Sequence, residues 1–280
     1  MYNGNYKFAI NTMGGAHLPP AEHVKLLREV GWNGFFTGWS PEKTPLFKQA
    51  ADECGMLYTS IHAPFTGVAA MWQGGEAAER ETAVYLACLE DCAKHDIPVM
   101  VLHPFIGFED HNPTEAGIES FAKVVARADA LGVRLGFENV EGEEYLSALY
   151  EHFGSCPSFG FCFDAGHELC YNRGKDMLAP YGHKLCHTHF NDNSGVSGKD
   201  IFWTDDLHLL MGDGIADWQN IMRRIRKADY SGVLTCELTL ANKPGRNTHD
   251  GYAAMQIKDF YALALSRMQA IGDMGKDLEV

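Results

Sequence analysis

The sequence predicts a single (β/α)₈ TIM barrel of class α/β, and three observations support this prediction. Short apolar segments alternate with segments of helical periodicity along the 280 residues. No linker, low-complexity segment or shift in composition divides the chain, so we expect one domain over residues 1–280. Most of the apolar segments end in an acid or a histidine, and TIM barrels place their functional side chains at the carboxyl ends of the strands.

The first half of the chain contains four of the expected strand–helix units. Strands are expected at residues 6–12, 34–37, 56–61 and 99–102. Helices are expected at residues 20–30, 42–54, 76–95 and 114–131. Gly31, Gly55 and Gly132 follow three of these helices, as expected for residues that end a helix in the left-handed conformation. Pro113 precedes the fourth helix, consistent with the frequent occurrence of proline at helix starts.

The second half repeats the pattern four more times. Strands are expected at residues 133–137, 159–163, 184–188 and 232–236. Helices are expected at residues 143–152, 173–181, 215–227 and 252–271, the second of them weakly. Residues 191–214 show no periodicity, and long segments of this kind in compact domains are usually functional loops. The polar residues 272–280 are expected to form a mobile tail.

The charge of the chain argues against a nucleic-acid partner. The formal net charge is −14, whereas nucleic-acid binding proteins usually carry basic clusters. The densest basic segment, residues 223–227, has helical spacing and is expected to be a solvated helix face. No apolar run approaches the roughly 18 residues that a membrane span needs.

The amino terminus and the cysteines indicate the compartment. Residues 1–7 lack the charged and apolar regions of a secretory signal. The eight cysteines are scattered without a CxxC motif, and several lie in apolar runs, as reduced buried thiols do. We therefore expect a reducing, cytoplasmic compartment.

Six successive expected strands each end in a side chain of a type that can bind a metal. These residues are His62, His103, Glu138, Asp164, His189 and Glu237. Two loop segments add His167, three residues after Asp164, and the alternate positions Asp206 and His208. Any one of them could be a hydrogen-bonded histidine or a helix-capping acid. Together they favour a divalent cation, because acids gathered in a barrel mouth are costly without a positive partner.

Four further residues are candidates for substrate contacts, namely His17, Trp39, Phe65 and His187. Aromatic side chains of the early loops, Trp39 and Phe65 with Trp72 and Phe105, could wall a pocket, although ordinary loop packing is the alternative. His17 is also a candidate. His187 lies two residues before His189 on the same strand face, so it lines the site or belongs to the core. The other histidines, at positions 23, 95, 111, 152, 183 and 249, are not expected to be ligands.

The strand ends resemble those of the xylose isomerase-like TIM-barrel superfamily, which includes sugar-phosphate isomerases/epimerases and endonuclease IV. The motifs are His62-Ala63-Pro64, His103-Pro104, Glu138-Asn139, Asp164-Ala165-Gly166-His167, His189-Phe190-Asn191-Asp192, the loop 206–214 and Glu237. They run from the third strand to the eighth. The resemblance implies a divalent metal at the carboxyl end of the barrel, with Mn²⁺ or Zn²⁺ expected first and Mg²⁺ or Co²⁺ as alternatives.

The resemblance leaves the number of metals open between one and three. In the epimerases of this superfamily one metal is held by residues that match Glu138, Asp164, His189 and Glu237. In endonuclease IV nine ligands hold three zincs, and the five additional matches are His62, His103, His167, Asp206 and His208.

Three functions follow from this pattern. The first is an isomerase or epimerase of a sugar, sugar phosphate or polyol, in which the metal stabilises an enediolate while Glu138 and Glu237 transfer protons on opposite faces. The second is phosphodiester hydrolysis of the endonuclease IV kind, which the net charge opposes. The third is a metal-bearing binding barrel without turnover. The expected partner is a small carbohydrate, and the sequence does not indicate which sugar it is or whether it is phosphorylated. A homo-oligomer is possible.

Overall fold

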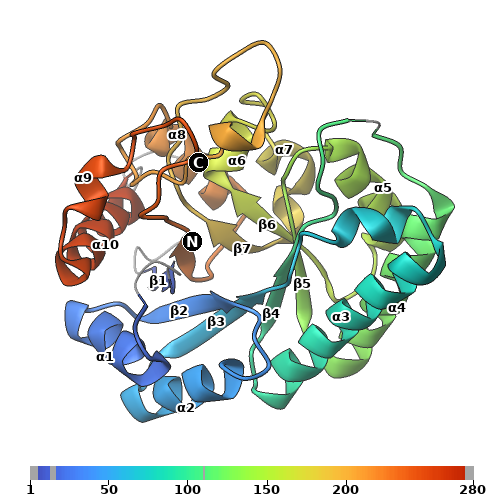
Figure 1. Cartoon of the computed structure of the whole chain (residues 1–280), viewed down its shortest axis with the longest axis horizontal. Coiled ribbons are helices and arrows are strands. Elements are labelled where there is room, and N and C mark those ends of the chain that lie inside the picture. Colours follow the sequence, from blue (N-terminus) through green and yellow to red (C-terminus); the bar gives the residue numbers. More distant parts are fainter. Residues whose placement is uncertain (1–5, 13–16, 110, 275–280) are drawn as a thin grey trace.

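A computed structural model describes residues 6–12, 17–109 and 111–274, which form a nearly closed barrel of eight parallel strands (Figure 1). The order in the sheet is β7-β6-β5-β4-β3-β2-β1-β8, so strands that are consecutive along the chain are neighbours. The strands are β1 (Phe8–Asn11), β2 (Gly34–Gly38), β3 (Leu57–His62), β4 (Val99–Leu102), β5 (Arg134–Glu138), β6 (Phe159–Asp164), β7 (Leu185–His189) and β8 (Leu234–Cys236). The predicted fold class is confirmed.

The barrel closes between β7 and β8 through few contacts. Phe190, directly after β7, donates its N–H to the carbonyl of Thr235 at 2.8 Å and accepts from the N–H of Glu237 at 3.1 Å. Below this point the Thr188 hydroxyl accepts the N–H of Thr235 at 2.9 Å, so a side chain takes the place of a backbone partner. This closure brings the carboxyl ends of β7 and β8 together, and these ends carry His189 and Glu237.

Helices surround the strands as an outer ring (Figure 1). They are α1 (Pro20–Val30), α2 (Thr44–Cys54), α3 (Gly75–Lys94), α4 (Glu115–Leu131), α5 (Glu143–Phe153), α6 (Ala165–Leu169), α7 (Leu178–Tyr181), α8 (Trp218–Lys227), α9 (Asp250–Ala253) and α10 (Ile257–Asp273). Short 3₁₀ helices are η2 (Val68–Trp72), η3 (Gly182–Lys184) and η4 (Trp203–Asp205). Gly31, Gly55 and Gly132 end α1, α2 and α4 with φ values of 111°, 62° and 70°, as the sequence predicts.

The helices after β6 and before β8 differ from the prediction, and capping side chains set the start of two of them. The Asp164 carboxylate accepts the N–H of His167, so α6 begins directly at the end of β6. The helix expected over residues 173–181 is reduced to the four residues of α7. Asp217 caps the N-terminus of α8 in the same way, and that helix therefore begins at Trp218 rather than at residue 215.

The carboxyl-terminal segment also differs from the prediction. The helix expected over residues 252–271 is two helices, α9 and α10. Gly272 and Asp273 belong to α10 rather than to a tail, since Gly272 is buried against Phe8 at the base of the barrel. The rest of the expected tail, residues 275–280, lies outside the described residues.

Aromatic residues fill the space between the strands and the helices. Phe35 on β2, Phe137 on β5 and Phe161 on β6 are almost fully buried there. All eight cysteines are free thiols, as the sequence predicts. Within the described part of the chain, no helix combines the length and the apolar character needed to cross a membrane.

Candidate active site

The nine side chains that the sequence nominates as metal ligands converge at the carboxyl ends of the strands. Their potential ligand atoms form three groups, in each of which all atoms lie within 4.8 Å of one another. The groups are His62, His103 and Glu138; Glu138, Asp164, His189 and Glu237; and His167, Asp206 and His208. Because these residues come from the ends of six strands, from helix α6 and from the long loop after β7, the barrel closure itself assembles the centre.

Glu138, at the end of β5, is shared by two of the groups. Its Oε2 lies 3.3 Å from Nε2 of His62 and 3.2 Å from Nε2 of His103. Its Oε1 lies 2.8 Å from Nδ1 of His189. The side chain is 0% exposed, so this carboxylate is enclosed by imidazoles.

The second group lies between β6, β7 and β8. The register of the sheet places Asp164 beside His189, and Nδ1 of His189 is 3.2 Å from Oε2 of Glu237. Phe36 stacks on the His189 ring with 4.7 Å between ring centres. The histidine is therefore fixed from below while both glutamates face the same nitrogen.

The third group depends on the long loop between β7 and α8. Oδ1 of Asp206 lies 3.4 Å from Nε2 of His167 and 3.0 Å from Nε2 of His208. His208 has φ of 52°, a conformation that costs energy for any residue other than glycine. Strain of this kind is often found where surrounding structure holds a functional side chain in place.

The charges of the second group oppose the effect of burial. Burial raises the pKa of Glu138, but the charge on His189 and hydrogen bonds from histidines outweigh it and hold this pKa well below its usual range. Burial likewise raises the pKa of Glu237, and His189 brings it down to about 2. Asp164 has less compensation, so burial raises its pKa to about 6 despite the charge on His167.

The third group shows the same balance. Burial lowers the pKa of His208, yet Asp206 raises it to about 9. Burial raises the pKa of Asp206, while His208 and His167 hold it well below the ordinary value. These acids thus stay ionised because the neighbouring imidazoles are protonated. A bound divalent cation would supply the positive charge in place of those protons.

Two observations show that the residues fit divalent cations. His62 donates its Nδ1–H to the carbonyl of Ala63 at 2.8 Å, and His208 donates its Nδ1–H to the carbonyl of Glu237 at 3.1 Å. In a neutral ring this leaves Nε2 as a lone pair that faces the centre. In addition, Nδ1 of His167 is buried without a hydrogen-bond partner among the described residues.

Asparagines that the sequence reasoning did not single out hold Asp164 in place. Asn139 accepts the N–H of Asp164 at 2.8 Å and donates to its carbonyl at 2.9 Å. Asn191 donates to Oδ2 of Asp164 at 2.8 Å. A Cβ at Gly166 would lie 1.8 Å from Oδ1 of Asn191, so glycine is required there. These residues directly follow or lie within the ligand motifs, which was the signal available in the sequence.

Asp192 anchors the long loop. This residue is fully buried, and its Oδ1 accepts the N–H groups of Asn193 and Ala216 at 2.9 and 3.0 Å. Its Oδ2 accepts the N–H of Gly212 at 2.7 Å and the indole N–H of Trp218 at 3.0 Å. The loop that carries Asp206 and His208 is therefore tied at both of its ends to one carboxylate.

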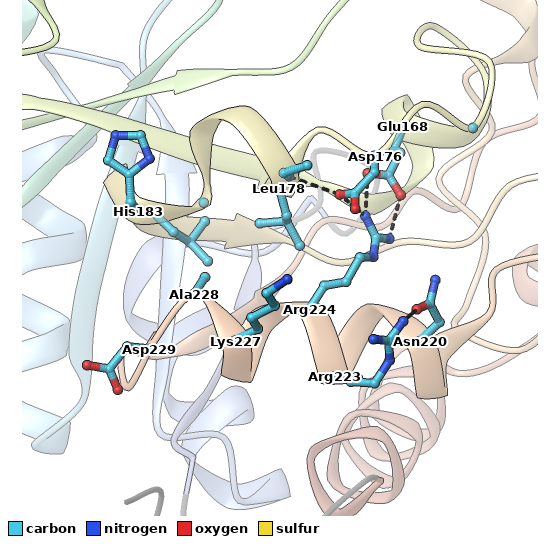
Figure 2. Close-up of a pocket in the computed structure, with 14 residues that line it drawn as sticks. Glu168, Asp176, Leu178, His183, Asn220, Arg223, Arg224, Lys227, Ala228 and Asp229 are labelled. Carbon is cyan, nitrogen blue, oxygen red and sulfur yellow. Dashed lines mark hydrogen bonds and ion pairs between the residues drawn. The ribbon is translucent and has the colours of Figure 1, made fainter. Parts of the chain in front are cut away.

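A buried ion pair anchors α6, which carries His167. Figure 2 shows Arg224 of α8 reaching Glu168, the residue after His167, with Asp176 beside it. The two nitrogen–oxygen distances to Glu168 are 2.6 and 2.9 Å. The side chain of Arg224 is only 10% exposed, so the prediction of a solvated helix face is wrong at this position. The pairing depends on tertiary contacts that helical spacing does not reveal.

A cavity of about 340 Å³ lies over the three groups. Six of the nine proposed ligands line it, namely His62, His103, His167, Asp206, His208 and Glu237. Aromatic side chains form much of its wall: Phe65, Phe108, Tyr171 and Trp203. Glu138 is not among the lining residues, since it lies beneath the histidines.

The structure brings one of the four predicted substrate contacts, Phe65, to this cavity. His17 and Trp39 border a different pocket beside β2, where the Trp39 indole donates to Asp91 at 2.8 Å. His187 lies inside the barrel, bonds the Ser60 hydroxyl at 3.1 Å and borders a pocket at the opposite end of the strands.

The other early-loop aromatics serve packing. Trp72 packs on Phe121 and Tyr145, and Phe105 stacks on Tyr145. The cavity wall instead uses residues that the sequence reasoning missed: Phe108, Glu141, Tyr171, Trp203 and Lys243. The lack of periodicity over residues 191–214 was the available signal for Trp203.

The pattern that describes the xylose isomerase-like TIM barrel family matches residues 22–258. The chain belongs to this family. Relatives of the barrel include the uncharacterized protein MJ1311 of Methanocaldococcus jannaschii, 23% identical over 221 residues that cover 72% of this chain and 69% of that protein.

Two further relatives of this xylose isomerase-like barrel carry functional names. A probable endonuclease 4 of Chloroflexus aurantiacus is 25% identical over 189 residues, which cover 63% of this chain and 64% of that protein, less than two thirds of its length. The solved structure of an L-ribulose 3-epimerase superposes with a TM-score of 0.70 and 15% identity over 96% of this chain and 95% of that one. At this identity the superposition shows the shared fold alone.

Proposed function

We propose that this barrel is a divalent-metal-dependent isomerase or epimerase that acts on a small polyhydroxylated ketone. The observation that carries the proposal is the cavity, whose floor is made of ligand groups and whose wall is aromatic. Its volume of about 340 Å³ is at the lower end of the range for small-molecule pockets, which suits a monosaccharide better than a polymer.

Glu138, Asp164, His189 and Glu237 would hold the first cation, with Mn²⁺ or Zn²⁺ proposed first and Mg²⁺ or Co²⁺ as alternatives. When bound, the cation supplies Lewis-acid stabilisation of negative charge at the substrate carbonyl oxygen. The other five ligands could hold one or two more cations.

Glu237 is the proposed proton-transferring residue. Its side chain is 20% exposed and borders the cavity, so a substrate bound there can reach its carboxylate. Glu138 would transfer protons in the two-glutamate hypothesis. Because Glu138 is buried beneath His62 and His103, we assign it first to metal binding, and its catalytic role stays a prediction.

The test is solvent exchange. Protein loaded with Mn²⁺ would be incubated with D-tagatose, D-psicose and L-ribulose in D₂O, and deuterium at the carbon beside the carbonyl would be followed by NMR. We expect incorporation, and a fall of at least about 10²-fold for Glu237→Gln, the usual size of a lost acid–base contribution. Glu151→Gln on α5, an exposed position, is the control. Conversion without label would contradict proton abstraction, and no conversion of any ketose would favour a binding barrel.

Phosphodiester hydrolysis is the second candidate, and the completeness of all three ligand groups favours it. The cavity walls and the net charge of −14 oppose a duplex substrate, because DNA affinity depends on phosphate neutralisation. Elemental analysis of metal per chain and nicking of an abasic-site duplex at low salt would separate the two candidates. A cytoplasmic location and a homo-oligomer stay predictions.

A further inference from the structure

Glu141 is a buried acid of the cavity wall that belongs to none of the three ligand groups. It follows Glu138 by three residues, in the turn between β5 and α5, and is 4% exposed. The backbone N–H of Gly107 donates to its Oε1 at 2.9 Å. Burial raises the pKa of Glu141, and the amides of Gly107 and of Glu141 itself lower it in part.

The charge on His167 lowers the pKa of Glu141, but this effect is smaller than that of burial. Among the described residues, none of the lysines, arginines or histidines forms an ion pair with Glu141, unlike Glu138, Asp206 and Glu237. Buried acids are normally paired or fully hydrogen-bonded, because an unpartnered one costs free energy. A carboxylate has about four acceptor positions, so two amides leave capacity that only a group inside the cavity can use.

The cavity lining contains no lysine or arginine that is free of an acidic partner. Lys243 is the sole lysine or arginine among its lining residues, and its Nζ lies 3.4 Å from Oδ2 of Asp206 and 5.5 Å from the centre of the Trp203 ring. The nearby Arg246 is paired with Asp205 at 2.7 Å. A phosphate group placed against Glu141 would therefore meet this acid with no free lysine or arginine beside it, and the cations held by the ligand groups would lie on the floor rather than in this part of the wall.

We propose that Glu141 binds a hydroxyl group of the substrate and selects uncharged polyhydroxy ketones against their phosphate esters. This inference rests on the proposed function, since it names the substrate class of the same cavity. A hydroxyl donor forms a charge-assisted hydrogen bond with the acid, whereas a phosphate dianion meets repulsion and loses its hydration.

The experiment measures binding, which does not require turnover. Dissociation constants of D-tagatose, L-ribulose and their terminal phosphate esters would be measured by calorimetry on the Mn²⁺-loaded full chain. The variants are Glu141→Gln, which keeps the size, and Glu141→Asp, which keeps the charge, with Glu151→Gln as the exposed control. Circular dichroism would verify that each variant is folded.

We expect at least one free ketose to bind wild-type protein at least tenfold more tightly than its phosphate ester. Glu141→Gln should weaken the binding of that ketose by about tenfold or more, which corresponds to the loss of one hydrogen bond to a charged group. It should also reduce the ratio between the dissociation constants of the ester and of the free ketose. Glu141→Asp should retain rejection of the ester, and Glu151→Gln should change neither. The proposal is overturned if wild-type protein prefers the esters, if it binds none of the sugars, or if Glu141→Gln leaves the ratio unchanged.

The outcome is separable from the failure of the proposed function. Selective binding that depends on Glu141, without deuterium incorporation, would support this inference and reject the isomerase. Deuterium incorporation into a phosphate ester, with no effect of Glu141→Gln, would support the isomerase and reject this inference.

Discussion

Replacing Asp192 by asparagine tests how the long loop between β7 and α8 is held. Both carboxylate oxygens accept two N–H groups each, from the backbone and from Trp218. An asparagine amide has one acceptor oxygen and one NH₂ group. In either orientation the NH₂ group faces two N–H donors, so Asp192→Asn loses two hydrogen bonds in a site without solvent.

The size of the effect follows from these contacts. A buried donor that loses its partner costs about 1–3 kcal/mol, so two such donors cost about 2–6 kcal/mol. The donors on the Oδ2 side belong to Gly212 and Trp218, and those on the Oδ1 side belong to Asn193 and Ala216. Whichever side is lost, the loop between them becomes less constrained, and metal affinity of the third ligand group should fall as well.

Urea unfolding followed by circular dichroism would measure the free energy of unfolding, and elemental analysis would measure metal per chain. Asp217→Asn is the matched control, because Asp217 caps α8 from the same loop and asparagine caps helices about as well as aspartate. A loss of unfolding free energy below about 1 kcal/mol for Asp192→Asn, or an equal loss for both variants, would refute the role of Asp192 in holding the loop.

Three further predictions concern pH, an ion pair and metal. Burial lowers the pKa of His23 to about 4, so below pH 6.5 the unfolded chain binds a proton that the folded chain does not bind. The free energy of unfolding should therefore fall by at most about 3 kcal/mol between pH 6.5 and 4. His23→Gln should remove this pH dependence in urea titrations. Arg224→Met should cost about 3–5 kcal/mol in urea unfolding by leaving Glu168 unpaired, and Glu168→Gln should recover part of that loss; equal stability of the single and double variants would contradict this. Chelation should lower the melting temperature by about 10 °C, and Mn²⁺ or Zn²⁺ should restore it, because a cation present at about 1,000 times its dissociation constant contributes about 4 kcal/mol to stability. Glu138→Gln should reduce this change in melting temperature. A melting temperature that chelation does not change would count against the proposed metal centre.

The barrel and its ligand ring could be predicted because their signals are local. Each strand is an apolar run, and the ligand stands at its end, so reading order along the chain is enough to place Glu138, Asp164 and His189 around one rim. Substrate and catalytic roles of these residues stay predictions, since they depend on what the cavity binds.

The cavity wall could not be predicted, because it is set by tertiary contacts. Phe108 and Trp203 come from segments without periodicity, and their positions depend on loops tied elsewhere, as by Asp192. Trp39 was a reasonable wall candidate by sequence, yet its indole N–H finds a partner in Asp91 and turns away. His187 has the correct strand face but sits one layer deeper than His189.

The junction between β7 and β8 has a consequence for how such a barrel changes over evolution. Ladders of paired residues, two of them with a bulge, fix the register of the other neighbouring strands, whereas a hydroxyl of Thr188 and the two amide contacts of Phe190 fasten this one. We expect a substitution there to change the alignment of these two strands more readily than one within a paired ladder. Since His189 and Glu237 stand on either side of this junction, its alignment sets the spacing of these two proposed ligands.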